Sequence, residues 1–189
     1  MTTDQVIETF KKSGALLEGH FKLTSGLHSS VYLQCALVLQ FPEKAEAFAR
    51  AIADQCEGTQ IELVASPAIG GLIIGHEVAR ALGARFIWTE RQDGEMILRR
   101  GFSVRPGEKT LVVEDVVTTG GSTRETIDAL RKAGASVIGA ASIIDRSSGQ
   151  ADVGAERITL ATFDVRSMQP DECDLCRAGV EVVKPGSRK

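Results

Sequence analysis

The feature that most constrains the fold is the alternation of short apolar runs with amphipathic helical segments between residues 42 and 165. Apolar residues recur at helical spacing within 42–56, 70–82 and 122–133, and each of these segments is followed by a glycine that can end a helix. Apolar runs of strand length lie at 61–65, 85–89, 109–113, 136–144 and 158–165. Strands that alternate with helices pair in parallel, so the pattern predicts an α/β fold with a mostly parallel sheet flanked by helices on both faces.

The 189 residues fit one domain of ordinary size, and we expect a single domain over residues 1–189. Its small N-terminal hood is expected near residues 1–40, and its tail begins near residue 170. The segment 92–108 carries Gly94, Gly101, Pro106 and Gly107 between short apolar stretches, which predicts a hairpin or a mobile loop.

Composition and charge exclude several classes of protein. Hydrophobic residues make up 43% of the chain and charged residues 25%, as in a globular protein. The N-terminus lacks an apolar signal segment and no run reaches the roughly 18 apolar residues of a membrane span, so we expect a cytoplasmic protein. A net charge of −3 argues against a nucleic-acid-binding surface, which needs clustered Lys and Arg.

The chain has four cysteines, of which Cys173 and Cys176 form a Cys-x-x-Cys pair in the tail. This spacing is found in half of a zinc site and in redox pairs. A tetrahedral site needs two more ligands, however, and Cys35 and Cys56 lie far away within periodic segments. The sequence therefore favours reduced thiols without a metal, and no residue is assigned as a metal ligand.

The most specific motif is the stretch 111–123, in which an apolar run is followed by two acids, a Thr/Gly turn and a helix start. Amides of a turn that opens a helix bind phosphate, and glycines permit close approach. Adjacent carboxylates can accept hydrogen bonds from ribose hydroxyls. The alternative is a plain strand end and turn, with Ser122 as N-cap. The order of residues favours a site for a ribose 5-phosphate, formed by Glu114, Asp115, Val116, Val117, Thr118, Thr119, Gly120, Gly121 and Ser122.

This stretch resembles the signature loop of type I phosphoribosyltransferases, which bind 5-phosphoribosyl-1-pyrophosphate (PRPP). The segment LEGHFKLTSGLHS at 17–29, followed by Tyr32 and Gln34, is similar to the N-terminal segment of orotate phosphoribosyltransferases. Asp145-Arg146 resembles the Asp-Arg pair of the same family, and 66–71 resembles its pyrophosphate loop. The resemblance covers nearly the whole chain to about residue 150. It is close to a bacterial branch of the family that ends in a Cys-x-x-Cys tail.

The resemblance implies transfer of the phosphoribosyl group from PRPP to orotate in pyrimidine biosynthesis, with Mg²⁺ as cofactor and a homodimer as the assembly. It implies catalytic roles for Glu114 and Asp115, and orotate binding by Thr118, Tyr32 and Arg146. Arginine suits the orotate carboxylate because its guanidinium binds bidentately. The alternative for Arg146 is an ion pair with Asp145 or Glu156, and the alternative for Tyr32 is core packing.

The chain departs from the family pattern in three places. Ile69-Gly70 stands where many members have Tyr-Lys, and Thr24 stands where they have a lysine near orotate, with Lys22 two positions earlier. The loop 90–101 has no lysine or histidine. We therefore expect Arg91, which aligns with the loop lysine, to act on pyrophosphate, in a loop that is poorly ordered without ligand and closes on binding.

Arg99 and Arg100 are further candidates for this role, although three arginines on a hairpin can also be solvated surface. The departures keep two other functions open. One is a PRPP-binding regulator with weak or no catalysis, and the other is a purine phosphoribosyltransferase.

Overall fold

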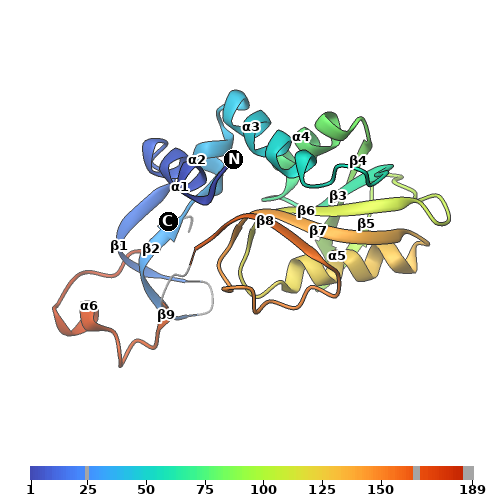
Figure 1. Cartoon of the computed structure of the whole chain (residues 1–189). Helices are drawn as coiled ribbons and strands as arrows, with labels where there is room; N and C mark the ends of the chain where they lie inside the picture. Colours follow the sequence, from blue (N-terminus) through green and yellow to red (C-terminus); the bar gives the residue numbers. More distant parts are fainter. Residues whose placement is uncertain (24–25, 164–166, 185–189) are drawn as a thin grey trace.

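A computed structural model describes residues 1–23, 26–163 and 167–184. Its centre is a six-stranded sheet in the order β5-β4-β3-β6-β7-β8 (Figure 1). All neighbouring strands are parallel except the pair β4 and β5. This arrangement confirms the predicted α/β fold. The strands are β3 (Leu63–Pro67), β4 (Arg85–Gln92), β5 (Glu95–Leu98), β6 (Lys109–Val117), β7 (Ser136–Asp145) and β8 (Arg157–Thr162).

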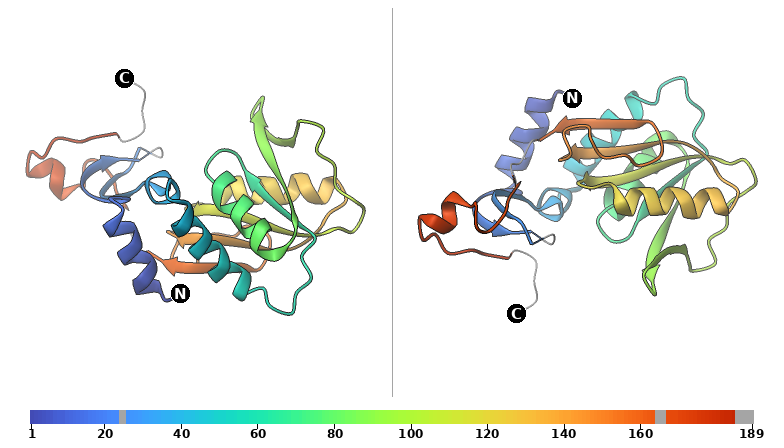
Figure 2. Two further views of the ribbon diagram at one scale, coloured as in Figure 1. Left: turned by 90° about the horizontal axis from the view of Figure 1, so that it is seen from above. Right: turned by 90° about the horizontal axis from the view of Figure 1, so that it is seen from below.

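Helices cover both faces of this sheet, as predicted. Helices α3 (Pro42–Asp54) and α4 (Leu72–Leu82) pack on one face, and α5 (Gly121–Lys132) packs on the other (Figures 1 and 2). Pro42 occupies the first turn of α3, where its missing N–H costs nothing. Gly83 ends α4 in the left-handed conformation, with φ of 67°.

The core has two layers because the central strands are buried on both faces. Leu111 and Val113 of β6 face the cluster beneath α3 and α4, whereas Val112 faces the cluster beneath α5. This two-sided burial explains why the strand reads as a continuous apolar run rather than as an alternation.

A hood lies at one end of the main sheet (Figure 2). It contains a small antiparallel sheet in the order β1-β2-β9. Helix α1 joins the hood to the main sheet, because Val6 and Phe10 belong to the core cluster that also contains Leu160 of β8. The hood elements are α1 (Thr3–Lys12), β1 (Leu16–Lys22), β2 (His28–Leu33), α2 (Cys35–Leu39) and β9 (Ser167–Met168), and the tail adds α6 (Asp174–Arg177).

Several boundaries differ from the sequence prediction. Strand β6 runs four residues further than expected, because β7 continues beside it as far as the pair Val117 and Asp145. Glu114 and Asp115 therefore lie within the strand rather than beyond its end. The predicted strand 61–65 begins two residues later, and part of the one predicted at 158–165 falls outside the described residues.

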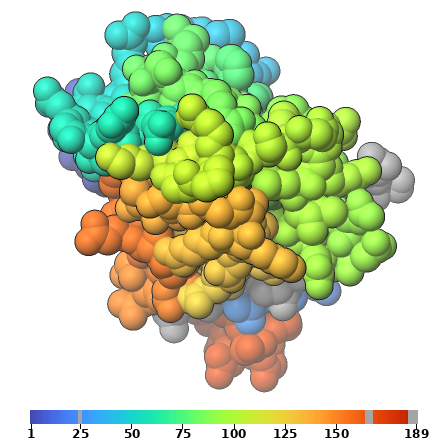
Figure 3. Space-filling view, turned by 90° about the vertical axis from the view of Figure 1, so that its right-hand side faces the viewer, coloured from blue at the N-terminus to red at the C-terminus, as the bar shows by residue number. Residues whose placement is uncertain are grey.

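The segment 92–108 contains the predicted hairpin, in which β4 and β5 are joined by a turn at Asp93 and Gly94, both with positive φ. The chain from this hairpin to β6, lime-green in Figure 3, forms much of the surface at that end of the molecule. Among the described residues, no helix combines the length and the apolar character that a membrane span requires.

Candidate active site

Three loops meet at one edge of the main sheet. They follow β3, β6 and β7, which are adjacent and parallel, so their carboxyl ends lie side by side. The amide of Arg146, after β7, donates to the carbonyl of Val117 at 2.8 Å. On the other side, a Cβ atom added to Gly70 would lie only 2.9 Å from Asp115 Oδ1. The loops at 66–71, 118–121 and 146–149 thus lie together at the strand ends, beside the two acids.

The loop after β6 forms an anion cradle at the start of α5. A pocket of about 50 Å³ is lined by Glu114 and residues 116–123. The first helical bond is donated by Arg124 to Gly120, so the preceding amides have no helical carbonyl to bind. These amides, together with the positive end of the helix dipole, favour a bound anion.

Gly120 is required at the entrance to this helix. Its φ is 79°, and a Cβ atom there would lie 2.8 Å from Val153 Cγ1. Gly120 is also the N-cap residue, and the cap has no side-chain hydrogen bond. The alternative that Ser122 serves as the N-cap is therefore wrong, and Ser122 lines the same pocket as Thr118 and Thr119.

Glu114 and Asp115 form a coupled acidic pair beside the cradle. Their side chains share a hydrogen bond, and burial followed by the Asp115 charge raises the pKa of Glu114. Burial also raises the pKa of Asp115, although the Val116 amide donates to its Oδ1 at 2.8 Å and partly offsets this. Both shifts favour the protonated form of the pair over the doubly ionised one, and a cation or a hydroxyl donor nearby would favour the carboxylate form.

Cys35 is a site neighbour that the sequence analysis missed. Its thiol, at the start of α2, donates a hydrogen bond to Asp115, and burial followed by the Asp115 charge raises the thiol pKa well above its usual range. The residue occupies a buried position in an apolar helix, so its sequence context does not distinguish it from a core residue. The contact brings the hood against the acidic pair.

The pyrophosphate loop suggested by the resemblance follows β3. Gly71 packs closely against the backbone of β6. A Cβ atom at this position would lie 2.8 Å from the Val113 carbonyl oxygen. The peptide between Ala68 and Ile69 is cis. Ile69 is 84% exposed, so an apolar residue faces solvent in this loop.

Arg146 extends from the end of β7 towards the hood. Burial lowers its pKa, while the Tyr32 hydroxyl and the Cys35 thiol act in the opposite direction. Its Nε atom is buried and has no hydrogen-bond partner among the described residues. Asp145 instead pairs with Arg157 at 3.2 Å. Among the described residues Arg146 forms no ion pair with Asp145 or Glu156, so that alternative is wrong.

The structure brings Tyr32 and Thr118 to the same region as Arg146. Tyr32 is half-buried, and its ring packs 5.7 Å from that of Phe21, so it has a packing role as well as an electrostatic contact with Arg146. Thr118 is exposed at the end of β6 and lines the anion pocket. Thr24 lies outside the described residues.

The hairpin arginines form ion pairs outside the pocket. Arg91 pairs with Glu125 of α5 and donates to the Gly94 carbonyl, while Arg99 and Arg100 both pair with Glu90. All three side chains are about half exposed. A role for Arg91 on pyrophosphate and ordering of the loop by ligand both stay predictions.

Comparison with known proteins relates most of the chain to one domain family. Residues 38–169 match the model of the phosphoribosyl transferase domain family. The chain is 52% identical to an orotate phosphoribosyltransferase of Pelotomaculum thermopropionicum over the full length of both proteins. It is 50% identical to one of Chlorobium phaeobacteroides, with 100% of this chain and 97% of that protein covered.

Solved structures give the same picture. The crystal structure of orotate phosphoribosyltransferase from Aeropyrum pernix is similar with a TM-score of 0.68 and 27% identity, covering 84% of this chain and 93% of that one. An adenine phosphoribosyltransferase from Rhodothermus marinus has a TM-score of 0.66 at 20% identity, with 85% and 99% covered. The second likeness concerns the fold alone.

Proposed function

The chain belongs to the orotate phosphoribosyltransferase family, and we propose that the pocket at the carboxyl edge of β3, β6 and β7 is where it transfers the phosphoribosyl group of PRPP to orotate. The products are orotidine 5′-monophosphate and pyrophosphate, in pyrimidine biosynthesis. The observation that carries this assignment is an anion cradle directly beside an acidic pair.

The 5-phosphate binds to the amides from Thr118 to Ser122. Support comes from the unbonded first-turn amides of α5 and from the hydroxyls that line the same pocket. The ribose diol binds to Glu114 and Asp115, of which Glu114 lines the same pocket as the cradle. Carboxylate oxygens accept hydrogen bonds, so hydroxyl donors would favour the ionised form that burial disfavours.

Mg²⁺ accompanies PRPP in this proposal. The acidic pair fits a hard cation, since its carboxylate oxygens lie next to a pocket made for phosphate, and the ion can be held largely by substrate phosphates and water. When bound, Mg²⁺ neutralises charge on the departing pyrophosphate. The acids themselves stabilise the positive charge that develops on the ribose as its bond to pyrophosphate breaks.

Orotate binds between Arg146, Tyr32 and Thr118. A partly buried guanidinium with an unpartnered Nε suits the orotate carboxylate, because charge-assisted bidentate bonds would satisfy donors that no described residue accepts. The Tyr32 ring offers an aromatic surface beside it. Arg91 neutralises pyrophosphate once the β4–β5 hairpin moves, and exchange of its Glu125 partner for a phosphate is the step that this requires.

The whole chain forms one domain, which the core shared by α1 and the main sheet supports. The protein acts as a homodimer, and it works in the cytoplasm. Family membership supports the last two.

A panel assay tests the function. Purified protein with PRPP and Mg²⁺ is offered orotate, uracil, adenine, guanine and hypoxanthine in turn, and pyrophosphate release is measured. We expect release with orotate alone. Pyrophosphate release with a purine base would contradict orotate as the substrate. Binding of PRPP without pyrophosphate release for any base would indicate a PRPP-binding regulator instead.

A further inference from the structure

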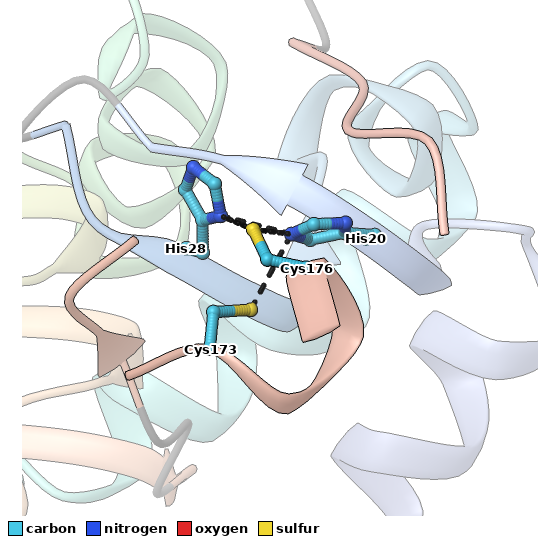
Figure 4. A group of neighbouring side chains, drawn as sticks. All are labelled: His20, His28, Cys173 and Cys176. Atoms are coloured by element: carbon cyan, nitrogen blue, oxygen red, sulfur yellow. Dashed lines mark hydrogen bonds between the residues drawn. The ribbon is translucent and has the colours of Figure 1, made fainter. Parts of the chain in front are cut away.

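Four side chains that can ligate a metal converge where the tail meets the hood. They are His20 of β1, His28 at the start of β2, Cys173 before α6 and Cys176 within it (Figure 4). One ligating atom from each lies within 4.8 Å of all the others. His20 and Cys173 are 153 positions apart in the sequence, so the fold alone brings them together.

The spacing of these atoms is close to that of the ligands of one tetrahedral ion, with two distances inside the expected range and two up to 0.4 Å shorter. His20 Nε2 lies 2.9 Å from His28 Nδ1 and 3.4 Å from Cys173 Sγ. Cys176 Sγ lies 3.2 Å from His28 Nδ1 and 3.7 Å from His20 Nε2. Zinc bonds of about 2.0–2.1 Å to nitrogen and about 2.3 Å to sulfur place tetrahedral ligand atoms about 3.3–3.8 Å apart.

The hydrogen bond on the far side of His20 fixes which of its nitrogens faces the cluster. His20 Nδ1 lies 2.8 Å from the Val180 carbonyl oxygen, so Nδ1 carries the proton and Nε2 carries the lone pair. Histidine ligands of zinc are commonly oriented by such a bond to a backbone carbonyl. That single lone pair faces three potential donors, His28, Cys173 and Cys176, and it cannot accept from all of them.

We propose that His20, His28, Cys173 and Cys176 bind one Zn²⁺ ion in a closed structural site. Two thiolates and two imidazoles are a donor set that favours zinc over the oxygen-seeking Mg²⁺. Binding converts both thiols to thiolates and releases two protons to solvent, with no change in oxidation state. Four protein ligands leave no position for substrate, so the ion takes no part in phosphoribosyl transfer.

The ion would hold together elements that are weak on their own. Helix α6 has four residues, too few to be stable in isolation. Beyond it, the tail touches β1 through the Val183 amide, which donates to the His20 carbonyl at 2.8 Å, and through the Lys22 amide, which donates back at 2.9 Å. Both histidines flank the turn between β1 and β2, and β2 carries Tyr32. Zinc therefore fixes the tail and braces the strand that reaches the active site.

Metal analysis of the full chain tests the proposal, with matched controls that the sequence supplies. Protein purified without chelator and then dialysed should retain about one zinc per chain. Cys173→Ser and His20→Ala should lose it. The matched controls are Cys56→Ser, in a buried cysteine far from the cluster, and His76→Ala, in the one other histidine, and both should retain it. If the controls lose zinc to the same extent as Cys173→Ser and His20→Ala, the proposed zinc site is wrong.

Cobalt substitution of the wild-type protein gives a second readout that does not depend on whether variants fold. A Cys₂His₂ site should give the intense visible bands of tetrahedral Co²⁺ and a thiolate-to-cobalt charge-transfer band in the near ultraviolet. Wild-type protein that retains no zinc and gives no such spectrum would overturn the proposal. So would a Cys173–Cys176 disulfide in protein purified without reductant, seen as a loss of two hydrogens by mass spectrometry.

Discussion

The carboxyl edge of the main sheet and the junction of hood and tail both gather side chains from distant parts of the chain, but by different means. At the sheet edge, adjacent parallel strands place the loops that follow them side by side, so a motif at the end of one strand predicts which loops lie beside it. At the junction, a long tail with one short helix places Cys173 and Cys176 against His20 and His28. The first arrangement can be read from strand order, whereas the second depends on contacts that no local pattern specifies.

The largest effect is expected at the centre of the sheet-edge site. Asp115→Asn should lower turnover by about a hundredfold or more while the fold is retained, because it removes a carboxylate from beside the reacting ribose. Steady-state kinetics with PRPP and orotate measure this. Asp128→Asn, in an exposed acid of α5, is the control and should keep wild-type turnover. Wild-type turnover in Asp115→Asn would assign that side chain a structural role.

The orotate half of the site is tested next. Arg146→Ala should raise the KM for orotate about ten- to a hundredfold, because a charge-assisted pair contributes about 1.5–3 kcal/mol. The KM for PRPP serves as an internal control and should change little. Equal increases in both KM values would show that Arg146 has a general structural role at the carboxyl edge of the sheet rather than a specific role in binding orotate.

The sequence predicted the β4–β5 hairpin but not the ion pairs that its arginines form. Arg91→Ala should cut turnover at least tenfold while PRPP still binds, because the cradle is intact. Single-turnover kinetics together with a PRPP binding titration separate the two effects. If Arg91→Ala, Arg99→Ala and Arg100→Ala all keep full activity, the hairpin is not the catalytic element.

At the amino ends of the parallel strands, a substitution should change the stability of the protein without changing its kinetics. Glu108 is buried and paired with Arg85 at 2.7 Å and Arg105 at 2.8 Å, and the Arg85 hydrogen bond contributes most to lowering its pKa from 4.5 to about 2. Glu108→Gln should reduce the free energy of unfolding by about 1–3 kcal/mol at neutral pH and leave the KM values unchanged.

The pH dependence of this effect follows from the direction of the pKa shift. The folded-state pKa lies below the ordinary value, so the stabilisation is complete above about pH 4.5 and is lost as pH falls towards about 2. Chemical denaturation of both proteins across this range measures it. A difference between them that stays constant down to pH 2 would contradict the ionic role of Glu108.

The sequence predicted the main sheet well because its signals are local. Helix limits at Pro42 and Gly83 agree with the structure, since proline and glycine act on their own backbone. The end of β6 was placed four residues early because its length depends on pairing with β7, which a pattern within one strand does not reveal. The acidic pair was found nonetheless, because the order of residue types around it was specific.

The hood was harder to predict because its contacts are long-range. The pairing of β9 with β2 joins residues about 140 positions apart. Cys35 has the context of a core residue, and its contact with Asp115 depends on how α2 docks. His20 and His28 lie within the segment 17–29, about 150 positions before the Cys-x-x-Cys pair. Nothing in their spacing connects these histidines to the tail.

The most direct test of the central claim is calorimetric titration of PRPP with Mg²⁺ into wild-type protein and Gly120→Ala. We predict one binding site per chain in the wild type and loss of binding in Gly120→Ala, because a Cβ atom there would meet Val153 and distort the cradle. Gly83→Ala has a similar left-handed backbone with open space around it, and it should bind PRPP as the wild type does. No binding to the wild type at millimolar PRPP, or equal binding by Gly120→Ala, would contradict the assignment of this loop.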